Sequence, residues 1–388
     1  MDEKRIFMDH AAGQAVDARV LEAMLPYFGT AYGNPSSLYQ EGVRARRALD
    51  EARERVAACL GAYPNEIFFT SGGTESDNWA VRCGSGSGRI LTSDLEHPAV
   101  REAIDALRRQ GREVDRLPVL PSGMVDIEAL RTRLERGGVS LVTLMHANHE
   151  TGVVQPVEAV ARMTRAVGAR SLCDAVQSVA WEKIDTHAMG VDFLSISGHK
   201  LGAPRGIGAL YVRRGIDLPA LLHGGGQESG KRSGTESVAL AVGLAAALER
   251  TGEARDAKNA RVMALSEQLL RGLRQIPGVT VNGWTEEARQ LPGTVNVSVD
   301  CVSGGALTLW LDRRGVCVSP GSACSAAGNH PSLTLLAMGR DENAAMSAIR
   351  FSLGEPNTAE EVENVLALVR EGVQKLRSLD VVGSVRYP

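Results

Sequence analysis

The feature that most constrains the fold is a regular alternation of strand-like and helix-like segments between residues 89 and 212. Segments with apolar residues at helical spacing lie at about residues 98–110, 126–136 and 156–167. Short apolar runs typical of strands lie between and beside them: R-I-L-T-S, E-V-D-R-L-P-V, V-S-L-V-T-L-M, R-S-L-C-D-A, F-L-S-I-S and I-G-A-L-Y-V. Strands that alternate with helices form a mostly parallel sheet covered on both faces. We therefore predict an α/β fold.

Polar side chains follow four of these predicted strands, at the point where each strand ends. Ligands of parallel sheets bind at the carboxyl ends of the strands, so these side chains are expected to converge on one cleft. They are His97, the group Asn148, His149 and Glu150, the pair Asp174 and Gln177, and Lys200.

The regions on either side of this alternation predict a second, smaller domain. Helices are expected at residues 16–28 and 41–60, and two more at residues 237–250 and 254–273. From residue 279 onward short strands and helices follow in an α+β pattern. We predict a large domain over residues 15–255 and a small domain formed by residues 1–14 and 256–388.

Composition excludes several classes of function. The 388 residues carry a net charge of −3 with acids and bases interspersed, so direct binding of nucleic acid is not expected. No apolar run reaches the length of about 18 residues that a membrane span needs, and the first ten residues show no secretory pattern. The six cysteines form no C-x-x-C pair, so neither a disulfide framework nor a metal site is expected. We expect a cytoplasmic protein.

Lys200 stands where a buried strand ends, in the stretch V-D-F-L-S-I-S-G-H-K. An amine in a poorly solvated place loses its proton readily and becomes a nucleophile that condenses with aldehydes. Ser197 and His199 offer hydrogen-bond donors suited to a phosphate. The alternative is a solvent-facing lysine in an ordinary glycine-rich loop.

A second phosphate signal is the strand-turn-helix unit F-F-T-S-G-G-T-E-S, in which Thr74 lies near the start of a helix. Unpaired N–H groups and the positive dipole end make a helix N-terminus a site for anions. The alternative is that this segment is an ordinary strand followed by a capped helix that binds no anion.

Asp174 ends the apolar strand S-L-C-D, where a lone carboxylate is costly without a cationic partner. A protonated ring nitrogen would supply that cation, and Gln177 could donate to a phenolate on the same ring. A buried aspartate that caps the next helix is the alternative. Together with Lys200, Asp174 forms the pair that a pyridoxal phosphate enzyme requires.

Cys324 lies among Gly, Ser and Ala in V-C-V-S-P-G-S-A-C-S-A-A-G-N-H-P, without an apolar run around it. Free cysteines are usually buried, so a thiol expected on an exposed loop is interpreted as a nucleophile. The other cysteines except Cys173, which is left open, are predicted to be core residues: Cys59, Cys83, Cys301 and Cys317.

These motifs together resemble the NifS/IscS-like cysteine desulfurases of the class V aminotransferase superfamily, which have the fold-type I architecture of pyridoxal phosphate enzymes. The resemblance runs from D-H-A-A near residue 9 to R-F-S-L-G near residue 354. It is carried by G-N-P-S-S, F-T-S-G-G-T-E-S, E-H-P-A-V, D-A-V-Q-S, S-G-H-K, H-G-G-G-Q-E, R-S-G-T and G-S-A-C.

The resemblance implies pyridoxal 5'-phosphate as cofactor and assigns residues to it. Lys200 would hold the cofactor aldehyde as an imine, and His97 would stack on the ring and act as acid and base. Asp174 would pair with the ring nitrogen and Gln177 with the phenolic oxygen. The phosphate would be bound by Gly73, Thr74, Ser197 and His199 and, from the other subunit of a homodimer, Thr235.

The resemblance also implies the reaction, the conversion of L-cysteine to L-alanine. Arg350, helped by Asn34, would bind the substrate carboxylate, and Cys324 would take the sulfur as a persulfide and pass it to an acceptor protein. Iron–sulfur assembly and thio-modification of tRNA, a cofactor or DNA all stay open as pathways. Selenocysteine lyase, cystine or cysteine C–S lyase and a non-enzymatic scaffold are the alternatives.

The chain departs from the family pattern beside the expected cofactor. Where the family usually has N-N-E-x-G this chain has N-H-E-T-G, so His149 replaces the asparagine expected at the phenolic oxygen. Imidazole can donate the same bond but can also gain a charge. Gly73 stands where alanine is usual.

Overall fold

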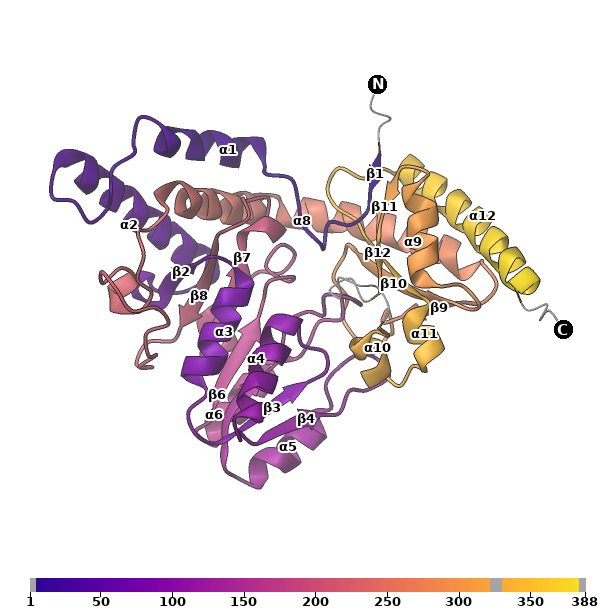
Figure 1. Cartoon of the computed structure of the whole chain (residues 1–388), viewed down its shortest axis with the longest axis horizontal. Helices are drawn as coiled ribbons and strands as arrows, with labels where there is room; N and C mark the ends of the chain where they lie inside the picture. The colour runs from indigo at the N-terminus through magenta and orange to yellow at the C-terminus, as the bar shows by residue number, and fades with distance from the viewer. Residues whose placement is uncertain (1–4, 322–329, 384–388) are drawn as a thin grey trace.

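A seven-stranded sheet forms the centre of the large lobe of the computed structural model, which describes residues 5–321 and 330–383 (Figure 1). The strand order is β2-β8-β7-β6-β5-β3-β4. All strands run parallel except β8, which is antiparallel to both of its neighbours. The strands are β2 (Ile67–Thr70), β3 (Arg89–Ser93), β4 (Val114–Leu117), β5 (Val139–Thr143), β6 (Arg170–Asp174), β7 (Phe193–Ser197) and β8 (Gly208–Val212). The predicted α/β class with a mostly parallel sheet is confirmed.

The direction of β8 follows from the short connection that precedes it. Parallel neighbours need a crossover of a dozen or more residues, usually a helix. Between β7 and β8 lie only residues 198–207, which contain a single 3₁₀ turn, η3 (Gly198–Lys200). The chain therefore turns back beside β7.

Helices cover both faces of this sheet. Successive strand residues point to opposite faces, so Leu141 and Phe193 pack toward α3 (Gly73–Gly84) and α4 (Pro98–Arg109). Val142 and Leu194 belong to the larger core on the other face. The helices of that face are α2 (Gln40–Leu60), α5 (Ile127–Glu135), α6 (Val157–Ala166) and α7 (Thr186–Met189), with α1 (Ala18–Met24) and the 3₁₀ helix η1 (Leu25–Phe28) outside them.

One continuous helix, α8 (Val238–Arg274), connects the two lobes (Figure 1). The prediction of two helices with a break near residues 251–253 was wrong. Thr251 is buried within the helix, its hydroxyl donates to the carbonyl of Ala247 at 2.7 Å, and a single glycine, Gly252, is tolerated in a helix this long. The predicted boundary at residues 255 and 256 falls within α8.

The small lobe contains a four-stranded antiparallel sheet in the order β12-β13-β10-β9. The N-terminal strand β1 (Ile6–Phe7) pairs with β11 (Val316–Cys317) beside it. The four strands are β9 (Val279–Asn282), β10 (Thr294–Val299), β12 (Ser319–Pro320) and β13 (Ala348–Ser352). The helices are α9 (Gly304–Asp312), α10 (Leu333–Ala337), α11 (Glu342–Met346) and α12 (Ala359–Gly383).

The described cysteines form no disulfide bond. The five described cysteines are free, and Cys173 is fully buried. Cys301, predicted as a core residue, is exposed in a turn after β10 with a φ of 59°, so that prediction was wrong. Among the described residues no helix combines the length and the apolar character that crossing a membrane requires.

Candidate active site

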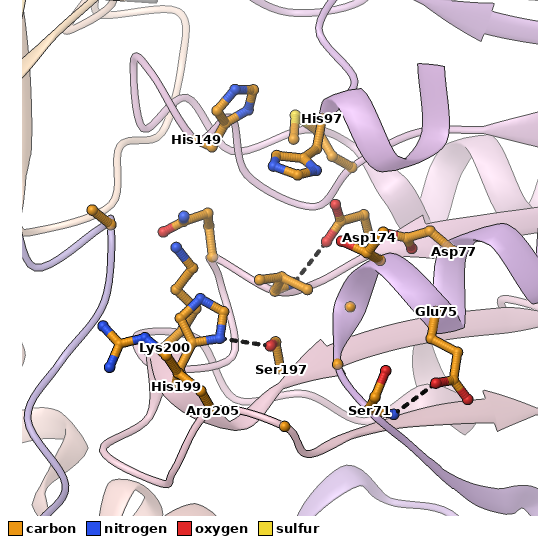
Figure 2. A pocket seen from close by; sticks show the side chains of 18 residues that line it. Ser71, Glu75, Asp77, His97, His149, Asp174, Ser197, His199, Lys200 and Arg205 are labelled. Atoms are coloured by element: carbon orange, nitrogen blue, oxygen red, sulfur yellow. Dashed lines mark hydrogen bonds between the residues drawn. The ribbon is translucent and has the colours of Figure 1, made fainter. Parts of the chain in front are cut away.

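A cavity of about 430 Å³ opens at the carboxyl ends of β6 and β7, next to the start of α3 (Figure 2). It is lined by every residue predicted to contact a cofactor except Thr235: Gly73, Thr74, His97, His149, Asp174, Gln177, Ser197, His199 and Lys200. The strand ends expected to converge therefore do so, because the strands are parallel, but Asn148 and Glu150, which were expected in the same cleft, are buried and do not line it.

Lys200 ends the 3₁₀ turn η3 directly after β7 and projects into this cavity (Figure 2). Its Nζ donates to the carbonyl oxygen of Ala11 at 2.5 Å. The amide of Gln14 donates to the backbone oxygen of Lys200 at 2.8 Å. The N-terminal segment thus closes the cavity beside the amine of Lys200, which is half-buried.

The start of α3 forms an anion-binding surface on the opposite side of the cavity. Its N-cap Gly72 has a φ of 153°, and a Cβ at Gly73 would lie 2.7 Å from Cγ2 of Val176. Val176 thus leaves little room for a side chain at position 73. Gly72, Gly73 and Thr74 line the cavity, and the N–H groups in the first turn of a helix have no acceptor within the helix, so they are available to an anion. Ser197 Oγ lies 2.9 Å from His199 Nδ1 within the same lining.

Asp174 lies at the end of β6 with 5% of its surface exposed. Its Oδ1 accepts a hydrogen bond of 2.9 Å from the backbone N–H of Val176. Burial raises the pKa of Asp174 to about 6, while that N–H and the charge of Lys200 oppose the rise. A cationic ligand group above this carboxylate would favour its ionised form.

His97 is the N-cap of α4, and this role fixes its tautomer. Its Nδ1 accepts a hydrogen bond of 3.1 Å from the N–H of Ala99, so the ring proton is on Nε2. Burial and then the charge of Lys200 lower the pKa of His97 to about 4. The imidazole is neutral at physiological pH and lies at the cavity wall, where it can exchange protons.

His149 lies edge-on to His97, with ring centroids 5.3 Å apart. Its Nδ1 is buried without a hydrogen-bond partner in the described part of the chain. Burial and the positive charge on neighbouring groups keep the pKa of His149 well below its usual value. The imidazole is therefore neutral, and the charge gain that the sequence allows is opposed by its surroundings.

Three predicted site residues do not line this cavity. Arg350 is 3% exposed, and its guanidinium contacts Asp9 at 2.8 Å and the carbonyl of His149 at 2.7 Å. Asn34 is exposed and accepts a hydrogen bond from the N–H of Ser36. Thr235 lines a smaller separate cavity.

Two other predictions need comment. Gln177 lines the main cavity, but its amide nitrogen donates to the carbonyl of Ala11 at 3.0 Å. Cys324, the predicted nucleophile, lies outside the described residues, in the segment 322–329.

Some lining residues were not foreseen. Asp77, one turn into α3, lies beside Asp174, and Arg205 and Ser71 also line the cavity (Figure 2). The three-residue spacing from Thr74 to Asp77 places both on one side of a helix and was the available signal. Arg205 follows Lys200 in the same glycine-rich loop.

Comparison with known proteins identifies the class to which this fold and site belong. Residues 6–365 match the sequence profile of the aminotransferase class-V family. Because the match spans most of the 388 residues, the chain belongs to that family.

The relatives define the branch. A protein named cysteine desulfurase IscS from Anaeromyxobacter dehalogenans (strain 2CP-C) is 46% identical over 383 residues, covering 96% of this chain and 94% of the relative. One of the same name from Methanosarcina thermophila is 39% identical over 391 residues, covering 100% and 96%. A solved NifS-like protein is 36% identical with a TM-score of 0.89, covering 96% and 100%. The resemblance to the NifS/IscS-like group is thereby confirmed.

Proposed function

We propose that this protein is a pyridoxal 5'-phosphate-dependent cysteine desulfurase that converts L-cysteine to L-alanine and hands the sulfur to an acceptor. The observation that carries the proposal is the arrangement of Lys200, Asp174 and the start of α3 around one cavity. An amine, a buried carboxylate and an anion-binding helix end match the aldehyde, ring nitrogen and phosphate of that cofactor.

The cavity residues fit the cofactor group by group. Lys200 would hold the aldehyde carbon, Asp174 the ring nitrogen, and His97 one face of the ring. The phosphate would be bound by the N–H groups of Gly73 and Thr74 and by the side chains of Ser197 and His199. When bound, pyridoxal phosphate withdraws electrons from the substrate Cα and so weakens the bonds around that carbon.

The side chains of this chain supply binding and proton transfer. The half-buried amine of Lys200, which lines the cavity, would move a proton at the substrate Cα. His97 Nε2, with its tautomer fixed by the start of α4, would donate a proton on the ring side. The segment around Ala11 and Gln14 limits the access of water to Lys200.

Cys324 would carry the sulfur. Its thiolate attacks the substrate sulfur, a Cys324 S–S bond forms, and the substrate Cβ–S bond breaks. The electron pair of the broken bond stays with the carbon skeleton, and protonation gives alanine. One cysteine and one Cys324 thiol thus yield alanine and a persulfide, without an external oxidant or reductant.

We also propose a homodimer. Large apolar side chains are exposed along one N-terminal stretch that includes α1 and the start of α2: Leu21 46%, Leu25 58%, Phe28 63%, Leu38 97% and Val43 57%. Solvent exposure of so many apolar residues in one stretch is typical of a surface that another chain covers. Thr235 is exposed and does not line the main cavity of its own chain, so it could contact the cofactor of a second subunit.

The chemistry of a persulfide indicates what kind of acceptor the sulfur would pass to. Persulfide sulfur passes most directly to a thiolate, so we propose an acceptor protein with a reactive cysteine, in iron–sulfur assembly or in a thio-modification pathway. The described cysteines are free, which is consistent with the reducing cytoplasm.

The test separates desulfuration from the alternative lyase chemistry. Cys324→Ala is expected to abolish sulfide and alanine formation from L-cysteine and to retain selenide release from L-selenocysteine. Cys301→Ala, which changes an exposed cysteine elsewhere, is the matched control and should keep both activities. Full cysteine turnover by Cys324→Ala would contradict the proposed sulfur path.

A further inference from the structure

Two buried carboxyl groups, those of Asp77 and Asp174, line the main cavity, and a third, that of Glu96, is influenced by the charge of Asp174 without lining the cavity. Asp77 lies in α3 and Glu96 precedes α4, each with 1% of its surface exposed, and Asp174 ends β6 with 5% exposed. Figure 2 shows the side chains of Asp77 and Asp174 next to each other. The mechanism uses only Asp174, so the two other acids need an explanation.

The three carboxyl groups differ in the number of hydrogen bonds that their oxygens accept. Asp174 Oδ1 accepts from the N–H of Val176 at 2.9 Å, and Glu96 Oε1 accepts from the N–H of Met145 at 3.0 Å. Asp77 Oδ1 and Glu96 Oε2 are buried without a hydrogen-bond partner in the described residues. A buried ionised carboxylate normally has donors at both oxygens, and in each of these two groups one oxygen has none. Hydrogen bonding by Ser195 lowers the pKa of Asp77 and hydrogen bonding by Thr143 lowers that of Glu96, but burial has the larger effect on both.

Burial and neighbouring charges also favour the protonated forms of Asp77 and Glu96. Burial and then the charge of Asp174 raise the pKa of Asp77 well above its usual value and that of Glu96 to about 8. The pKa of Asp174 is raised to about 6, which is below that of Glu96. The other titratable or charged groups that influence this cluster are Cys173 on β6, Arg101 on α4 and Lys200 after β7.

We propose that Asp77 and Glu96 are positioning residues that stay neutral carboxylic acids and thereby confine the negative charge of this cluster to Asp174. As a carboxylic acid, Asp77 would offer a proton donor beside Asp174, whose charge acts on it. A donor on that side stabilises Asp174 as an anion, so that the proton shared with a cofactor ring stays on the ring nitrogen. This inference rests on the proposed function only in its last step.

The first test needs no cofactor and compares thermal unfolding of the full chain with that of Asp77→Asn and Glu96→Gln. An acid with a raised folded pKa loses its contribution to stability as pH rises above its unfolded value, because unfolding then releases a proton. The variants cannot ionise. Their unfolding midpoints are expected to equal that of the parent chain near pH 4 and to exceed it at pH 8.

A lower midpoint for both variants at pH 8, with equal midpoints at pH 4, would overturn the inference, since it would show that the acids are ionised and stabilised. The Glu96→Gln variant keeps the test valid if Asp77→Asn does not fold. Because the cofactor is absent, the result does not depend on the proposed activity.

The second test uses the holoenzyme with cofactor labelled with ¹⁵N in its ring, and reads the ring nitrogen by NMR. Asp77→Asn keeps a neutral donor and is expected to leave the nitrogen protonated. Asp77→Leu removes the donor and should shift the signal toward that of Asp174→Asn, in which the nitrogen loses its proton. An unchanged signal in Asp77→Leu, or equal shifts in both Asp77 variants, would contradict the proposed role.

Discussion

At the scale of single residues, position at a strand end explains most of the site. Lys200 and Asp174 could be predicted because each polar letter directly follows an apolar run that folds as a strand. Arg350 could not be placed in the same way. It lies inside β13, and only the folded chain shows that its guanidinium donates a hydrogen bond to Asp9, which is distant in sequence. Asp77 was missed because a polar residue within a helix usually faces solvent.

His97 has two roles that substitution can separate. Asparagine is a good N-cap, so His97→Asn should keep α4 stable while removing proton transfer, with kcat lowered roughly 10²- to 10⁴-fold. His97→Ala removes the cap as well and should cost about 1 kcal/mol of stability in addition.

Turnover assays and thermal unfolding of both His97 variants provide the check. Because the pKa of His97 is lowered to about 4, its protonation should not limit activity at pH 6, where an ordinary histidine would be largely charged. Near-normal turnover by His97→Asn would show that the imidazole is not an acid or base in the reaction.

At the scale of elements, periodicity predicted the strands and helices of the large sheet well. Each strand-like run between residues 89 and 212 is a strand, because its alternating residues fill two cores. The direction of β8 was not predictable from its apolar pattern, which is the same for either direction. The break expected in α8 was wrong because side chains of α8 before and after Gly252, such as Leu248 and Val262, are buried in the core, and this packing outweighs the weak helix propensity of Gly252.

The glycines of α8 allow a paired prediction. A Cβ at Gly252 meets no atom within 4 Å, so Gly252→Ala should stabilise the protein by about 1 kcal/mol. A Cβ at Gly243 would lie 2.5 Å from Met24 Sδ, so Gly243→Ala should instead lower stability. Thermal unfolding of both variants tests this, and a lower midpoint for Gly252→Ala would argue against an uninterrupted α8.

At the scale of the whole molecule, the exposed apolar stretch before α2 and the distant Thr235 lead to one expectation. Phe28→Asp places a charge in that stretch and should shift the protein from dimer to monomer, with weaker cofactor binding if Thr235 completes the partner's site. Leu309→Asp is the control, since Leu309 is 65% exposed on α9 in the other lobe.

Light scattering and cofactor titration measure both effects of Phe28→Asp. A parent protein that is monomeric at micromolar concentration, or a control variant that dissociates equally, would rule out this surface as the interface. Sequence alone could not show this stretch, because the residues of a helix that face a partner have the same apolar spacing as those that face a core.

The most direct test of the central claim is to locate the cofactor covalently. The purified protein is incubated with pyridoxal 5'-phosphate, reduced with borohydride, digested, and its labelled peptide identified by mass spectrometry. The label is expected on Lys200, and the Lys200→Ala variant should remain unlabelled while it folds normally. A label on another lysine, or an equally strong label in Lys200→Ala, would contradict the assignment of this cavity as the catalytic site.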